Sequence, residues 1–235
     1  MLFASLLVAV LMMVRRVNFS VGLRELSWLV LLGFFYFGSA TLLFQAYGSM
    51  SSGMATTLHF LYPIGVTLIM RLVFGQRTSP YTILAIVLAL SGVALLSLKG
   101  DVGMGSSPLS FVLVLLSGFS YAIYLVAINN VQLLRAMDNL KLTFYAIFFS
   151  GVFFLADSLL TGGLQPLPST AALGNLLLLA LVPTLISNLC LVRAIKSIGS
   201  TLTSVLGAME PLTAIVIGVL VLGEQVTLVM LTGML

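Results

Sequence analysis

Residues 194–224 read AIKSIGSTLTSVLGAMEPLTAIVIGVLVLGE, an apolar run that carries a glutamate and a proline side by side at positions 210 and 211. Both residues are unusual in such a run. A charged carboxylate is costly in an apolar environment, and proline removes a backbone donor and interrupts the hydrogen-bond ladder of a helix. The pair therefore marks a point where polarity and a helix break coincide.

This run has a counterpart earlier in the chain. Residues 46–76 read AYGSMSSGMATTLHFLYPIGVTLIMRLVFGQ and align with it without gaps at an offset of 194 − 46 = 148 residues. The identical pairs are Ala46 and Ala194, Ser49 and Ser197, Ser52 and Ser200, Leu58 and Leu206, Pro63 and Pro211, Ile69 and Ile217, and Gly75 and Gly223. The shared order of small residues, central proline and terminal glycine indicates an internal duplication.

The composition places the chain in a membrane. Of its 235 residues, 60% are hydrophobic and only 7% are charged, and the mean hydropathy is +1.23. A soluble domain carries about 25% charged residues, so this chain has too few to cover a water-facing surface. The net charge of +4 is spread along the chain without a basic patch, which excludes nucleic acid as an expected partner and leaves the lipid bilayer.

Apolar segments predict nine helices, because about 20 apolar residues cross a bilayer. They lie at 1–14, 27–47, 54–74, 80–98, 108–130, 142–162, 170–191, 200–222 and 226–235. With the loop after the first segment in the cytoplasm, nine of the ten basic residues fall on the cytoplasmic side and only Lys99 falls outside. The nine are Arg15, Arg16, Arg24, Arg71, Arg77, Arg135, Lys141, Arg193 and Lys196. This distribution follows the positive-inside rule and supports the predicted orientation.

The offset of the duplication spans five predicted helices, an odd number, so the second copy crosses the membrane in the opposite direction. Such an inverted repeat is a common architecture of secondary transporters. We therefore predict an all-α polytopic membrane protein built as two five-helix bundles, with a first repeat at 1–100 and a second at 106–235. At the same offset, helix 108–130 would pair with a helix before Met1. We expect a ten-helix design from which this chain lacks the first helix and parts of the second and tenth.

The repeated motifs resemble those of the EamA family of the drug/metabolite transporter superfamily. The resemblance covers the whole chain and rests on LYP at 61–63, MEP at 209–211, LGE at 222–224 and TILAIVLALSGVALL at 82–96. It departs at Gln76, where the family commonly has glutamate. The resemblance implies a ten-helix inverted-repeat bundle, alternating access around a central cavity, and small metabolites such as amino acids as substrates.

Glu210 is the first candidate for a binding or proton-coupling residue. It lies near the midpoint of the predicted helix 200–222, the depth at which transporter sites occur in broken helices. Pro211 has no amide hydrogen for the carbonyl of Gly207, so a freed carbonyl is expected beside the carboxylate. The alternative is that Glu210 only bonds to a neighbouring helix and locks the kink.

His59 and Tyr62 are the candidates in the first copy, where they precede the helix-breaking Pro63 and Tyr62 matches Glu210. Their spacing of three places them on one helix face. A histidine that titrates near neutral pH suits proton coupling, and a neutral histidine bonded to a backbone carbonyl is the alternative. Four more side chains are candidate substrate ligands or ordinary interhelical hydrogen-bond partners. They are Gln45, Tyr121, Tyr124 and Asn188.

These residues predict a secondary transporter for a small-molecule substrate in a bacterial cytoplasmic membrane, with proton coupling through Glu210 and His59. A lipid or lipid-linked flippase and a non-transporting membrane scaffold or enzyme are the alternatives, and a homodimer is left open. No enzyme, cofactor or metal is expected. One histidine and one cysteine cannot form a zinc site rich in these residues, and neither a GxSxG nor a Walker pattern occurs.

Overall fold

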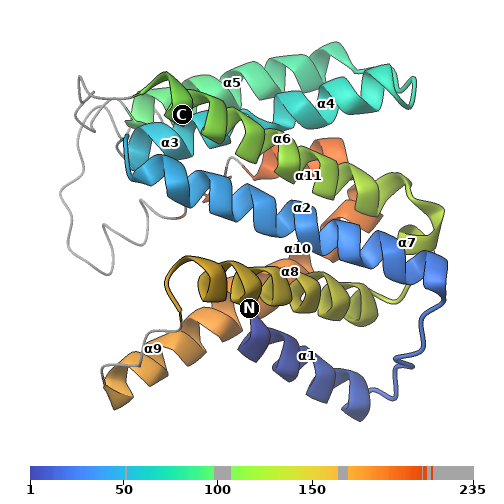
Figure 1. Ribbon diagram of the computed structural model, residues 1–235. Coiled ribbons are helices and arrows are strands. Elements are labelled where there is room, and N and C mark those ends of the chain that lie inside the picture. The colour runs from blue at the N-terminus through green and yellow to red at the C-terminus, as the bar shows by residue number, and fades with distance from the viewer. Residues whose placement is uncertain (51, 98–106, 164–168, 208, 211–212, 214–235) are drawn as a thin grey trace. The chain divides into compact units, whose positions relative to one another are not determined.

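A computed structural model describes residues 1–50, 52–97, 107–163, 169–207, 209, 210 and 213 of the chain, and these ranges contain helices and no strand. The helices are α1 (Leu2–Val14), α2 (Leu23–Tyr47), α3 (Ser52–His59), α4 (Tyr62–Leu72), α5 (Pro80–Ser97), α6 (Pro108–Asn130), α7 (Gln132–Ala136), α8 (Asn139–Thr161), α9 (Thr170–Leu179), η1 (Ala180–Ile186), α10 (Ser187–Ile198) and α11 (Ser200–Leu206). Figure 1 labels these helices along the chain. The fold is that of an all-α polytopic membrane protein.

The observed helices follow the predicted segments closely. Within the described residues, four continuous helical stretches are long and apolar enough to cross a membrane, namely Leu23–Tyr47, Pro108–Asn130, Asn139–Thr161 and Ala172–Ile198. The seventh predicted segment ended at 191, whereas the helix runs on to Ile198. The eighth begins as α11 at Ser200, and the ninth, 226–235, lies outside the described residues.

The helices divide into two compact units, each made of two separate parts of the chain. Unit 1 comprises Met1–Phe37 and Ala127–Gly199, and unit 2 comprises Gly38–Val126 and Ser200–Leu235. Each unit therefore takes residues from both predicted repeats, 1–100 and 106–235. The division falls within α2 and α6, so each of these two helices contributes residues to both units.

One face of α1 forms the core of unit 1. Ala4, Val8 and Met12 are completely buried at a spacing of four residues, and they pack with Ile147 of α8 and Leu185 of η1. Large side chains on the remaining surface of α1 stay exposed. They include Leu6, Val10 and Val14. An apolar exposed face opposite an apolar buried face is expected of a helix that lies between protein and lipid.

Helix α2 approaches α8 within unit 1 at Gly33. A Cβ added to Gly33 would lie 2.6 Å from the Cβ of Phe149 and 2.8 Å from the backbone nitrogen of Ser150. One turn farther along α2, the ring of Phe37 meets that of Phe154 edge to face at 4.9 Å. Small residues let the backbones of membrane helices approach closely. Here the close approach at Gly33 brings the aromatic side chains of the two helices into contact.

We expect Gly33→Ala to destabilise unit 1 by about 1–3 kcal/mol, the cost of inserting a methyl group into a packed interface. The backbone of α8 cannot move aside cheaply, because it belongs to a 23-residue helix. Thermal unfolding of the protein in detergent measures this effect. Gly174→Ala in α9 is the matched control, because a Cβ there meets nothing within 4 Å. Equal midpoints for the two variants would contradict the prediction.

Unit 2 is built around the junction of α2, α3 and α6. Ala46, Met50, Ala55 and Val114 form its buried apolar cluster. A hydrogen bond joins the hydroxyls of Tyr47 and Thr56 at 3.3 Å. The cluster holds the start of α3 against α6, and α11 packs against α4 and α5.

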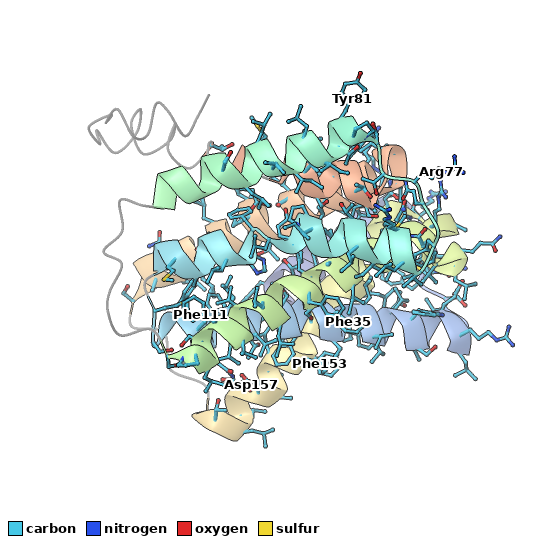
Figure 2. The ribbon with its side chains drawn as sticks, turned by 90° about the horizontal axis from the view of Figure 1, so that it is seen from above. Phe35, Arg77, Tyr81, Phe111, Phe153 and Asp157 are labelled. Atoms are coloured by element: carbon cyan, nitrogen blue, oxygen red, sulfur yellow. The ribbon has the colours of Figure 1, made fainter. Side chains whose placement is uncertain are left out.

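The terminal glycine of the first repeated motif lies in the turn that follows helix α4. Gly75 adopts a φ of 64°, a left-handed conformation that glycine accepts without strain, and the amide of Gln76 bonds to the carbonyl of Met70 at 3.0 Å. Figure 2 shows Arg77 and Tyr81 at this turn, at the opposite end of unit 2 from Phe111. The basic turn and the start of α6 thus lie at opposite ends, as the predicted orientation requires.

A third proline distorts the helix that was predicted at 170–191. Pro183 lies in the π-helical segment η1, between α9 and α10. The hydroxyl of Thr184 donates to the carbonyl of Leu179 at 3.0 Å across this wide turn. Proline removes one rung of the ladder, and the threonine hydroxyl supplies a replacement donor.

Candidate functional site

The helix break predicted at Pro63 is present. Helix α3 ends at His59, α4 begins at Tyr62, and a turn lies between them. Pro63 has no amide hydrogen for the carbonyl of His59, four residues earlier. Gly118 of α6 lies against that carbonyl, because a Cβ at Gly118 would stand 3.3 Å from it. The break therefore leaves the carbonyl of His59 without its usual helical donor, and this carbonyl faces a glycine of the neighbouring helix α6.

The second copy is also interrupted before its proline. Helix α11 ends at Leu206, and the amide of Glu210 donates to the carbonyl of Gly207 at 3.0 Å. The expectation that this carbonyl has no partner was wrong, because a tighter turn brings the amide of Glu210 into reach. Pro211 itself lies outside the described residues.

The two interrupted segments meet inside unit 2. Tyr62, at the start of α4, is buried, and its hydroxyl points at Gly207. A Cβ placed on Gly207 would lie only 1.8 Å from that oxygen. Glu210 lies one turn beyond Gly207, to whose carbonyl its amide donates, and its side chain is exposed. Tyr62 and Glu210, the matched positions of the predicted repeat, are therefore neighbours in the structure.

Four of the predicted site residues form one aromatic cluster. They are His59, Tyr62, Tyr121 and Tyr124. The ring of Tyr62 lies edge to face with that of Tyr121, with centroids 4.9 Å apart. The ring of His59 is 5.7 Å from Tyr62 and 5.8 Å from Tyr121. Tyr124 stacks on Tyr121 at 5.9 Å. Helices α3, α4 and α6 thus contribute to a single polar and aromatic cluster, His59–Tyr62–Tyr121–Tyr124.

Two serines that were not predicted complete this cluster. The hydroxyl of Ser117, completely buried on α6, lies 3.0 Å from Nδ1 of His59 and 2.6 Å from the backbone carbonyl of Ser39. The signal in the sequence is weak. Serine and glycine at 117–118 interrupt an apolar helix, as small residues do wherever membrane helices pack closely.

The other predicted ligands are not enclosed in this cluster. Gln45 is exposed on α2. Asn188 is buried in unit 1, where its amide donates to the hydroxyl of Tyr36 at 3.2 Å and to the carbonyl of Thr184 at 2.8 Å. Asn188 thus makes the ordinary interhelical hydrogen bond that was its alternative role.

The surroundings of the cluster are apolar. A groove of about 230 Å³ adjoins Tyr62 and is lined otherwise by leucine, isoleucine, phenylalanine and glycine. This volume is below the range of about 300–1,000 Å³ for ligand pockets, so the groove alone does not hold a substrate. No group of three or more histidine, cysteine, aspartate or glutamate residues that could hold a metal occurs in the described ranges.

A polar cluster held where interrupted helices meet among apolar spans is the arrangement of membrane transporters. The sequence matches the EamA-like transporter family over residues 1–98 and 108–235. The chain belongs to this family and is a multi-pass membrane transporter of the drug/metabolite transporter type.

One solved crystal structure, described only as that of a protein, has the same fold. It is similar to this chain with a TM-score of 0.80 and 15% sequence identity, over 98% of this chain and 79% of that one. At this identity the likeness shows the fold alone. None of the curated proteins compared with the sequence matched it.

Proposed function

We propose that this protein is a secondary transporter of a bacterial cytoplasmic membrane that moves small metabolites, such as amino acids or related compounds, by alternating access coupled to protons. The substrate and the proton would bind at the cluster His59–Tyr62–Tyr121–Tyr124 and at Glu210. The observation that carries the proposal concerns Tyr62, which lies at the interruption before Pro63. Its hydroxyl lies against Gly207, at the interruption in the second copy, and its ring lies beside that of His59.

The chemistry of these groups supports a small polar substrate. The phenols and the imidazole offer both donors and acceptors, and their ring faces attract organic cations. Glu210 and His59 can each bind a proton. Because ionisable groups within the membrane are costly, they are retained mainly where they act on ions or substrates.

The same geometry supports the proposal of alternating access. The short helices α3, α4 and α11 end at the cluster, so a rocking movement of the two repeats would change their contacts there. Interrupted helices at the substrate site are a common feature of such transporters. A ligand that binds one arrangement better than the other shifts their populations.

Transport by the purified full chain in proteoliposomes tests the proposal. An imposed pH gradient should drive accumulation of at least one compound from a labelled mixture of amino acids and small metabolites, and a protonophore should abolish it. Liposomes without protein are the control. Movement of a fluorescent phospholipid between leaflets, with no metabolite accumulated, would replace this function with that of a flippase.

A further inference from the structure

The hydroxyl of Ser117 contacts one of the two ring nitrogens of His59. This hydroxyl lies within hydrogen-bonding distance of two atoms, the carbonyl oxygen of Ser39 at 2.6 Å and Nδ1 of His59 at 3.0 Å. A hydroxyl has a single hydrogen to donate, and a carbonyl oxygen can only accept. The hydrogen of Ser117 is therefore directed at Ser39, and its oxygen must accept from His59.

The neutral ring of His59 consequently carries its hydrogen on Nδ1, and Nε2 is the acceptor. The ring of His59 bonds to Ser117 and lies beside the rings of Tyr62 and Tyr121. No residue in the described ranges forms a hydrogen bond with Nε2. Nε2 is thus the atom of this ring that can take up a proton or bind a donor group of a substrate.

The position of Ser117 is determined by packing. Ser117 is completely buried, and the adjacent Gly118 lets α6 approach the carbonyl of His59 closely. Three helices meet at this hydroxyl, since Ser39 belongs to α2, His59 to α3 and Ser117 to α6. The hydrogen bonds of Ser117 therefore depend on how α3 packs against α6.

We propose that Ser117 is a positioning residue that holds His59 in the Nδ1–H form and directs Nε2 toward the exchangeable proton. The titratable groups around the ring are Tyr62 on α4 and Tyr121 on α6, and Glu210 follows Gly207, which lies against the hydroxyl of Tyr62. Only the consequence for transport rests on the proposed function, because the assignment of the tautomer follows from the hydrogen bonds alone.

His59 is the only histidine in the chain, so nitrogen NMR of protein labelled with ¹⁵N-histidine reports on this ring alone. The full chain in lipid nanodiscs should show a protonated Nδ1 and an unprotonated Nε2 while the ring is neutral. In Ser117→Ala we expect a mixture of both tautomers, because the acceptor for Nδ1–H is lost. Ser117→Thr keeps the hydroxyl and should restore the Nδ1–H form.

Ser110→Ala is the matched control, since Ser110 is another completely buried serine of α6, and its hydroxyl bonds to those of Ser107 and Ser49 and not to the histidine. It should leave the histidine signals unchanged. An Nε2–H ring in the unmodified protein, or the same tautomer in Ser117→Ala as in the unmodified protein, would overturn the proposal.

The transport readout separates this inference from the proposed function. The pH at which proton-driven transport is half-maximal should move to lower values in Ser117→Ala, because the charged ring loses an acceptor, and should return in Ser117→Thr. An unshifted pH profile in Ser117→Ala would overturn the positioning role. If the unmodified protein transports without a proton gradient, the proposed function fails, and the tautomer is still decided by NMR.

Discussion

Replacing Glu210 with glutamine is expected to lower proton-driven transport at least about tenfold while the protein inserts and folds normally. Glutamine keeps the length of the side chain and its capacity for hydrogen bonds, but it can neither bind a proton nor carry a charge. A tenfold change corresponds to about 1.4 kcal/mol.

The same substitution separates the two interpretations of Glu210. If the side chain only locks the turn by a hydrogen bond, Glu210→Gln retains transport and only Glu210→Ala impairs it. Asp157→Asn is the matched control, because Asp157 is a carboxylate of helix α8 in the other unit. We measure uptake in proteoliposomes with and without a pH gradient. Full proton-driven uptake by Glu210→Gln would remove this residue from the coupling mechanism.

The second large effect is expected at Gly207. A Cβ at this position would lie 1.8 Å from the hydroxyl oxygen of Tyr62, far closer than two atoms that are not bonded can approach. The tyrosine cannot swing away freely, since it is buried and its ring is packed against those of His59, Phe60 and Tyr121. We expect Gly207→Ala to destabilise the protein by about 1–3 kcal/mol, the usual cost of overpacking.

Removing the opposing atom should relieve this clash. In the double variant Gly207→Ala with Tyr62→Phe, the hydroxyl oxygen is absent, and the next ring atom of residue 62 is 3.1 Å from the added carbon. The midpoint of thermal unfolding should therefore recover most of the loss, whereas Tyr62→Phe alone should change it little. If the double variant is as unstable as Gly207→Ala, the contact between residues 62 and 207 is not the cause.

Much of the fold could be predicted because membrane insertion depends on local composition. A span needs a sufficient run of apolar residues, and hydropathy located α1, α2, α5, α6 and α8 to within a few residues. The interruption before Pro63 was predictable for the same reason, since proline acts on its own helix. The π-helical turn at Pro183 was missed, because an adjacent threonine hydroxyl keeps that helix continuous.

Part of the candidate site was also accessible from local patterns. The spacing of His59 and Tyr62 predicted that they share a face, and their rings are in contact. Tyr121 joins them in the structure, whereas Asn188 bonds within unit 1 instead. All these residues are polar positions in apolar helices, and nothing in the local sequence separates those that share a cluster from those that do not.

The sequence by itself determined that this chain crosses a membrane, where its helices run, and at which proline a helix is interrupted, because each of these depends on residues close together in the chain. Tertiary structure alone decided that Tyr62 lies against Gly207, that Ser117 joins Ser39 to His59, and that parts of both predicted repeats combine in each unit. These contacts connect residues 58 to 145 positions apart, and packing between helices selects them. Small residues such as Gly118 and Gly207 permit such contacts, but the sequence does not specify which partner occupies the space beside them.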